Sequence, residues 1–204
     1  MIDFSTLFAA TGRSTLASLP EGLDALLLSQ WAMAGHQRDI LHICRDDVRM
    51  DQLAQAVRFF APQLEVLEFP AWDCVPYDRA SPSTQIIARR VDCLTQLALP
   101  RGDKGQTTGP TRLVLTTVAA VTQRVPRPVV FRRSTFPIFA GKDANVDALM
   151  GYLVRNGYQR AEQVMEPGEF AVRGGIIDLF APGSDEPYRL DFFGDEVDAI
   201  RTFD

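Results

Sequence analysis

Hydrophobic positions in the first half of the chain follow two alternating spacings. Short apolar runs are typical of buried strands, and longer segments repeat apolar residues at helical spacing. The runs span 39–44, 64–69 and 112–117, and the helical segments begin near Glu21, Asp46 and Thr84. Strands that alternate with helices indicate a parallel sheet with helices on its faces. We therefore predict an α/β domain over residues 1–126.

Two of the helical segments carry apolar stripes that predict which face is buried. Asp46 or Asp47 is the expected cap of the second helix, because a short acidic side chain accepts the free amides of the first turn. The stripes are Val48, Leu53, Val57 and Phe60 in the second helix, and Ile87, Val91 and Leu94 in the third.

The alternation of predicted strands and helices stops at 125–130, where two prolines end the α/β pattern. A strand is predicted at 134–139, and a helix follows it with Asp143 or Asn145 as cap and Gly157 at its end. Its inward residues are Val146, Leu149 and Leu153, and the later short strands fall near 158–164, 169–173, 175–181, 187–193 and 197–203. Residues 127–204 are thus predicted to form a smaller α+β domain, mostly antiparallel.

The last hairpin has two unlike faces. Gly194 and Asp195 suit a two-residue loop, since glycine takes a positive φ at the first loop position. Alternation places Tyr188, Leu190 and Phe192 on a core face, and Arg189, Asp191 and Phe193 on the other. The second face suits a protein partner. The alternative is that Arg189 and Asp191 pair with a neighbouring strand and that Phe193 is covered by the helix of its own domain.

Composition narrows the classes of protein. A net charge of -5 and a pI near 5.1 argue against a chain whose main task is to neutralise DNA phosphates. The basic run at 127–133 is interpreted as a solvated strand face. The apolar runs fall short of the roughly 20 residues that span a bilayer, and the N-terminus lacks a secretory signal, so no membrane association and a cytoplasmic location are expected.

Motifs for catalysis are missing. The segment ASLPEGLDALLL lacks the Gly-Lys-Ser/Thr of a phosphate loop, and the chain has no G-x-S-x-G or H-E-x-x-H sequence. Its three cysteines form no C-x-x-C pair, so neither a zinc site nor a disulfide framework is indicated. We expect no catalytic, cofactor-binding or metal residues in this chain.

Two long stretches, 69–94 and 164–204, resemble the N-terminal region of bacterial transcription-repair coupling factors (the Mfd family), which is similar to the repair protein UvrB. The resemblance implies a helicase-like α/β domain with a degenerate phosphate loop, followed by a domain that binds the excision-repair protein UvrA. It also implies that the chain is a fragment. RNA polymerase, double-stranded DNA, ATP and magnesium are then expected to bind domains beyond it, and the fragment is not expected to be an enzyme.

The same resemblance implies the UvrA contacts. Arg173 in AVRGG, and Arg189 and Phe193 in PYRLDFF, match contact positions of the relatives, and Asp191 matches an acidic position implicated in UvrB. The resemblance further implies that a C-terminal domain masks this surface in the full-length protein, so the module is expected to recruit UvrA to stalled RNA polymerase and to restrain the motor.

The alternative is a UvrB-like module that binds nucleotide or damaged DNA. The missing phosphate-loop residues speak against nucleotide, and the loop between Pro70 and Thr84 is too short for the DNA-engaging hairpin of UvrB. The role of the loop from Trp72 to Tyr77 stays open between core packing, packing at the seam between domains and a lost ancestral site.

Overall fold

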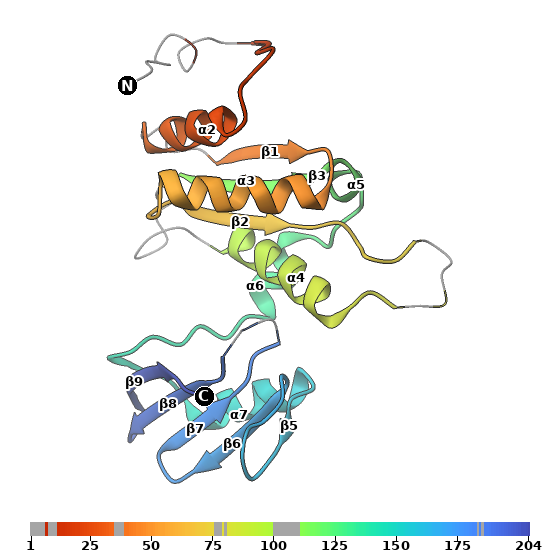
Figure 1. The fold of residues 1–204 in the computed structure, drawn as a ribbon. Helices are drawn as coiled ribbons and strands as arrows, with labels where there is room; N and C mark the ends of the chain where they lie inside the picture. Colours follow the sequence, from red (N-terminus) through yellow and green to blue (C-terminus); the bar gives the residue numbers. More distant parts are fainter. Residues whose placement is uncertain are drawn as a thin grey trace. The chain divides into compact units, whose positions relative to one another are not determined.

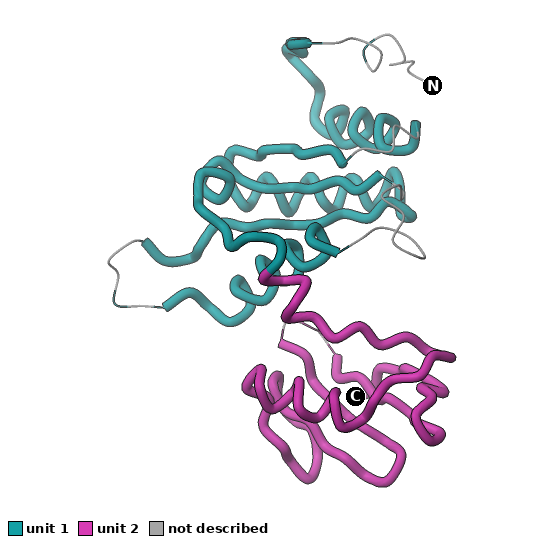
Figure 2. Tube along the Cα trace, turned by 180° about the vertical axis from the view of Figure 1, so that it is seen from behind, with its two compact units in different colours: residues 1–129 teal, residues 130–204 magenta. Residues whose placement is uncertain are grey.

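The chain divides into two compact units, residues 1–129 and 130–204 (Figure 2). Sequence analysis places the boundary after residue 126. The computed structural model describes residues 7, 12–34, 39–75, 79, 81–99, 111–182, 184 and 186–204. We describe each unit by itself.

Unit 1 contains a three-stranded parallel sheet in the order β1-β3-β2, with helices on both faces (Figure 1). Its strands are β1 (Ile40–Cys44), β2 (Glu65–Phe69) and β3 (Arg112–Thr117). Its described helices are α2 (Leu23–Met33), α3 (Asp47–Phe60), α4 (Thr84–Ala98) and α5 (Val118–Val121). The predicted α/β fold of this half is confirmed.

One face of the sheet is covered by α2 and α3. Leu113 and Leu115 of β3 are fully buried against Leu53 and Val57 of α3. Asp46 caps α3, because its Oδ1 accepts the backbone N–H of Arg49 at 2.8 Å. The predicted stripe is correct in the middle of α3 only. Val48 and Phe60, near the two ends of the helix, are exposed.

The opposite face is covered by α4 and α5, and of the predicted stripe only Leu94 packs on this core, whereas the predictions for Ile87 and Val91 are wrong. The buried residues of α4 are Ala88, Arg90 and Cys93, whereas Ile87 and Val91 are exposed. The apolar spacing of this helix is compatible with either face. Small side chains such as Ala88 let the helix approach the strands closely, and Arg90 finds hydrogen-bond acceptors only on the inner side.

Arg90 explains part of the loop that begins at Trp72. Its guanidinium lies between the rings of Phe69 and Trp72, 4.0 Å from each ring centroid. It donates Nη1–H to the Pro70 carbonyl at 2.5 Å and Nη2–H to Oε1 of Gln123 at 2.9 Å. Trp72 therefore contacts a residue of its own unit, although with an exposed fraction of 37% it is not part of the core. Tyr77 lies outside the described residues.

Unit 2 contains a six-stranded sheet in the order β4-β9-β8-β7-β6-β5. The strands are β4 (Lys142–Asp143), β5 (Gln159–Arg160), β6 (Glu169–Arg173), β7 (Ile176–Leu179), β8 (Tyr188–Phe193) and β9 (Glu196–Thr202). Only the β5–β6 pair is parallel among these ladders. The predicted mostly antiparallel α+β fold is confirmed.

Helix α7 (Val146–Arg155) covers one face of this sheet. Leu149 and Leu153 pack on Phe170, Ile177 and Leu190 of the strands, with Val146 partly buried beside them, as the stripe predicts. Asn145 caps the helix, because its Oδ1 accepts the N–H of Ala148 at 2.7 Å. Gly157 follows the end of the helix with φ 84°.

Two predictions for residues 127–139 are wrong. The basic run forms a short helix, α6 (Pro128–Arg133), which begins with a proline, the residue whose missing N–H costs nothing in a first turn. Residues 135–139 form no strand. Phe136 and Ile138 nevertheless pack on the core of unit 2, and Pro137 between them cannot donate to a ladder.

The described residues contain neither a membrane-spanning helix nor a cluster of metal ligands. None of their helices combines the length and the apolar character that crossing a bilayer requires. Within the same residues, His, Cys, Asp and Glu side chains nowhere gather in a group of three or more that could hold a metal ion.

Candidate functional site

The sheet of unit 2 has an outer face that points away from α7. Because opposite residues of paired strands share a face, the register brings Asp178, Arg189 and Arg201 into one row across β7, β8 and β9. We define the outer face by its charged and aromatic residues: Arg173, Asp178, Arg189, Asp191, Phe193, Arg201 and Phe203. It includes all four residues that sequence analysis selected.

Asp178 is the centre of the outer face. Its carboxylate accepts Nε–H and Nη2–H of Arg189 at 2.7 and 2.8 Å, and Nη2–H of Arg173 at 2.5 Å. The side chain of Asp178 is 1% exposed, although it lies on the face away from the helix. Two arginines from two different strands are thus bound to one buried carboxylate.

This arrangement shifts the proton affinity of both partners. The hydrogen bond from Arg189 lowers the pKa of the Asp178 carboxyl, the bond from Arg173 adds to the lowering, and burial acts in the opposite direction. The same hydrogen bond raises the pKa of Arg189. Arg189 also lies over the ring of Phe203, with Cζ 4.7 Å from the centroid. The guanidinium is therefore held from two sides.

A second ion pair joins β8 to β9. Asp191 of β8 pairs with Arg201 of β9. Arg189 and Arg201 are direct cross-strand partners, an unfavourable position for two like charges. Because Asp178 neutralises one of these charges and Asp191 the other, the repulsion is offset. The predicted alternative, pairing with neighbouring strands, is what Arg189 and Asp191 show within this chain.

Phe193 behaves differently. Its side chain is 84% exposed, so the alternative in which the helix of its own domain covers it is wrong. The ring comes directly before the Gly194–Asp195 turn, where Gly194 has the predicted positive φ of 66°. A large ring in this position is exposed to water, on the face that also carries the arginines.

A β-bulge shapes the hairpin. Asp191 faces Ala199, but the next residue, Phe192, faces Val197, so Asp198 is the extra residue. Ala199 and Val197 therefore lie on opposite faces although they are two apart in sequence. Val197 is fully buried as a result.

Gly175, the residue directly before β7, supports the same hairpin. Its carbonyl accepts the N–H of Phe192 at 2.7 Å, and a Cβ on Gly175 would lie 2.7 Å from the carbonyl oxygen of Phe192. Sequence analysis missed Asp178, Arg201 and Phe203. The only available signal was an aspartate inside the apolar strand IIDLF.

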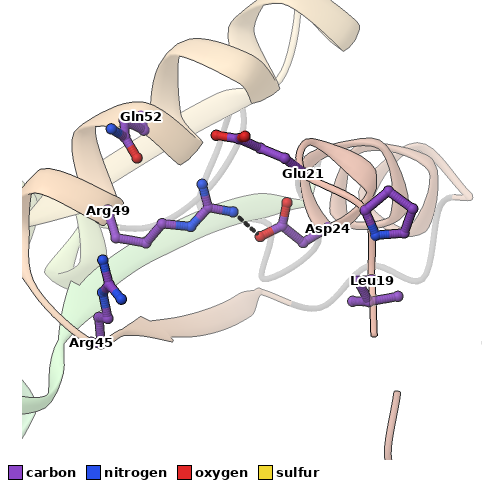
Figure 3. A pocket seen from close by; sticks show the side chains of 7 residues that line it. Leu19, Glu21, Asp24, Arg45, Arg49 and Gln52 are labelled. Atoms are coloured by element: carbon purple, nitrogen blue, oxygen red, sulfur yellow. Dashed lines mark hydrogen bonds and ion pairs between the residues drawn. The ribbon is translucent and has the colours of Figure 1, made fainter. Parts of the chain in front are cut away.

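A pocket of 390 Å³ in unit 1 is the other candidate (Figure 3). It lies at the segment that sequence analysis identified as a degenerate phosphate loop. Residues that line it include Leu19, Glu21, Asp24, Arg45, Arg49 and Gln52. Asp24 accepts Nη2–H of Arg49 at 2.5 Å and the N–H of Ala25 at 2.9 Å. The carboxylate of Asp24 thus already occupies the guanidinium of Arg49 and the N–H of Ala25, two groups that would otherwise be available to a phosphate.

Comparison with known proteins finds a family model for unit 2 and relatives that match both units. Residues 136–204 match the family model of the UvrB interaction domain. Over 93% of its length the chain is 34% identical to the transcription-repair-coupling factor of Haemophilus influenzae. The chain is homologous to a segment of the transcription-repair-coupling factors. The identity is 35% over 83% of the chain for the Escherichia coli protein, and 33% over 95% for that of Mycobacterium tuberculosis.

The chain spans 14 to 16% of the length of these three coupling factors. The match to the UvrB interaction domain covers β4 to β9 and α7, and therefore the whole outer face. The coupling factors are named for linking transcription to repair.

Proposed function

We propose that unit 2 binds UvrA through its outer face, and that a coupling factor uses this contact to recruit UvrA to stalled RNA polymerase. The observation that carries the proposal is Phe193, a bare aromatic ring on the same face as arginines whose geometry is set by carboxylates. A rigid ring fills a pocket at low entropy cost, and arginine offers a planar fork of donors to a carboxylate. The domain match over residues 136–204 supports the same reading.

The contact requires no chemistry from the chain itself. The outer face offers guanidinium groups and two rings, of which Phe203 already lies under Arg189, and the carboxylates of Asp178 and Asp191 are already paired with arginines. We propose that the chain acts as an adaptor without catalysis of its own, and that ATP and DNA act on other parts of a full-length coupling factor.

Calorimetric titration of the chain with UvrA tests the proposal. Truncating a central interface anchor costs on the order of 2 kcal/mol, so Phe193→Ala is expected to weaken binding about thirtyfold. Arg189→Ala is expected to weaken it by a similar factor. Two matched controls stand outside the outer face: Phe139→Ala, whose ring is 64% exposed, and Arg160→Ala on the far edge strand β5.

Both controls are expected to bind as tightly as the wild type. The proposal is refuted if the folded wild-type chain does not bind UvrA, or if the controls lose as much affinity as the outer-face variants.

The pocket beside α2 supports the competing reading, a nucleotide-binding module. Because Arg49 is already paired with Asp24 and no Gly-Lys-Ser/Thr is present, ATP with magnesium is expected to leave the melting temperature unchanged. A clear rise that depends on nucleotide concentration would favour the competing reading. A short loop between Pro70 and Thr84 likewise argues against engagement of damaged DNA.

The exposure of Phe193 also supports a regulatory role in a full-length coupling factor, with a C-terminal domain covering the outer face. Deleting the module is then expected to raise the ATPase rate of the motor. An unchanged rate would refute masking and leave UvrA binding to its own test.

A further inference from the structure

The outer face contains one group that is too buried to touch a partner and yet contacts both selected arginines. Asp178 lies on β7, between Arg173 at the end of β6 and Arg189 on β8. Three hydrogen bonds between 2.5 and 2.8 Å join its two oxygens to the two guanidinium groups. No partner residue could reach this carboxylate without displacing the arginines that cover it.

The hydrogen bonds leave donors free for a partner. A guanidinium has five N–H donors in a rigid fork. Among the described residues Arg189 gives two of them to Asp178, and Arg173 gives one. The bound edges face Asp178, so the remaining N–H groups point away from it. The side chains are 33% exposed for Arg189 and 54% for Arg173, which leaves these donors accessible.

Fixing the arginines in advance matters for affinity. Immobilising a long flexible side chain on binding weakens affinity by about two- to tenfold for each chain. Asp178 and Phe203 hold Arg189 before any partner arrives, and Asp178 holds Arg173. The charge on Asp178 also offsets the repulsion between Arg189 and its cross-strand neighbour Arg201.

We infer that Asp178 is a positioning residue for the UvrA contact: it aims Arg173 and Arg189 at carboxylates of the partner, while Phe193, farther along β8, enters an apolar pocket of the partner. This inference rests on the proposed function and specifies the chemistry of the partner surface. A planar donor fork held in place matches a carboxylate with two parallel hydrogen bonds. The matching surface on UvrA is therefore acidic, with an apolar pocket to one side of the acidic groups.

The decisive variant is Asp178→Asn, which keeps the size of the side chain and removes its charge. It is expected to weaken UvrA binding about tenfold, because a loss of about threefold for each of the two released arginines multiplies to about tenfold. In a chain that already carries Arg173→Ala and Arg189→Ala, the same substitution is expected to have no further effect. The matched control is Asp147→Asn, an exposed residue of α7 on the opposite side of the sheet, which should bind as the wild type does.

The double background separates positioning from mere stability. If Asp178→Asn weakens binding equally with and without the two arginines, the residue acts through the fold and the inference is overturned. Unchanged affinity of the single variant overturns it as well.

A second measurement needs neither UvrA nor a stable variant. Side-chain NMR of ¹⁵N-labelled arginine reports the mobility of each Nε–H bond. In the wild-type chain Arg189 is expected to be ordered and Arg160, on an exposed edge, to be mobile. Equal mobility of the two overturns the inference, even where Asp178→Asn fails to fold.

Failure of the proposed function would look different. If the wild-type chain does not bind UvrA, that function is rejected, and NMR alone decides the positioning role. An Arg189 that is ordered in the wild type and mobile in Asp178→Asn supports it, and unchanged mobility overturns it.

Discussion

Arg90 offers the sharpest test of how unit 1 is held together. It is a charged residue that is only 4% exposed, and its guanidinium has a ring on each side and an oxygen acceptor at each of two nitrogens. The perturbation is Arg90→Ala, which removes all four contacts and leaves the Pro70 carbonyl without its donor.

The expected cost follows from these contacts. Hydrogen bonds from a charged donor contribute about 1.5 to 3 kcal/mol each, and cation–π contacts about 0.5 to 2 kcal/mol each. Burying the charged guanidinium in the folded wild-type protein costs several kcal/mol of desolvation, which offsets part of this sum. We expect Arg90→Ala to lower the free energy of unfolding of unit 1 by about 3 kcal/mol, in the range of severe core substitutions.

Urea unfolding followed by tryptophan fluorescence is the suitable assay. Both tryptophans, Trp31 and Trp72, lie in unit 1, so the signal reports this unit alone. The control is Arg45→Ala, whose side chain is 83% exposed and pairs only with the adjacent Asp46 among the described residues. It is expected to change stability by less than about 0.5 kcal/mol. Equal effects of the two substitutions would refute the reasoning about Arg90.

Two further predictions concern unit 2. Gly175→Ala is expected to lower the melting temperature of unit 2, with a loss of about 2 kcal/mol in the free energy of unfolding, because the new Cβ would clash with the backbone oxygen of Phe192. Gly151→Ala on α7 should instead be neutral or slightly stabilising, because only the flexible end of Arg155 is near. Melting followed by circular dichroism compares the two variants. Asp178 has a pKa below its usual value of about 3.9, so its contribution to stability is complete above about pH 4 and is lost as pH falls through the lowered value. The amide protons of β7 and β8 should therefore lose protection from hydrogen exchange as the pH falls, and this loss should be weaker in Asp178→Asn. An equally steep loss in the variant would contradict the role of Asp178 in the pH dependence.

Local sequence determined much of the hairpin that carries the candidate site. Alternation along β8 was enough to place Arg189, Asp191 and Phe193 on one face, since side chains of a strand must alternate. Gly194 marked the turn because the loop needs a positive φ. Sequence narrowed each helix cap to two residues, and the structure selects Asp46 and Asn145, each of which accepts the amide N–H three residues away.

Tertiary structure decided which side chains meet. The partners of Asp178 come from β6 and β8, so their meeting depends on the register between strands, which no local pattern contains. The bulge at Asp198 puts Val197 and Ala199 on opposite faces, against the alternation rule. In α4 the spacing of apolar residues allowed two faces, and the need of Arg90 for buried acceptors and aromatic neighbours selected the face that lacks Ile87 and Val91. Sequence alone thus determined the elements and their local geometry, while long-range pairing determined the core of unit 1 and the charge arrangement of the outer face.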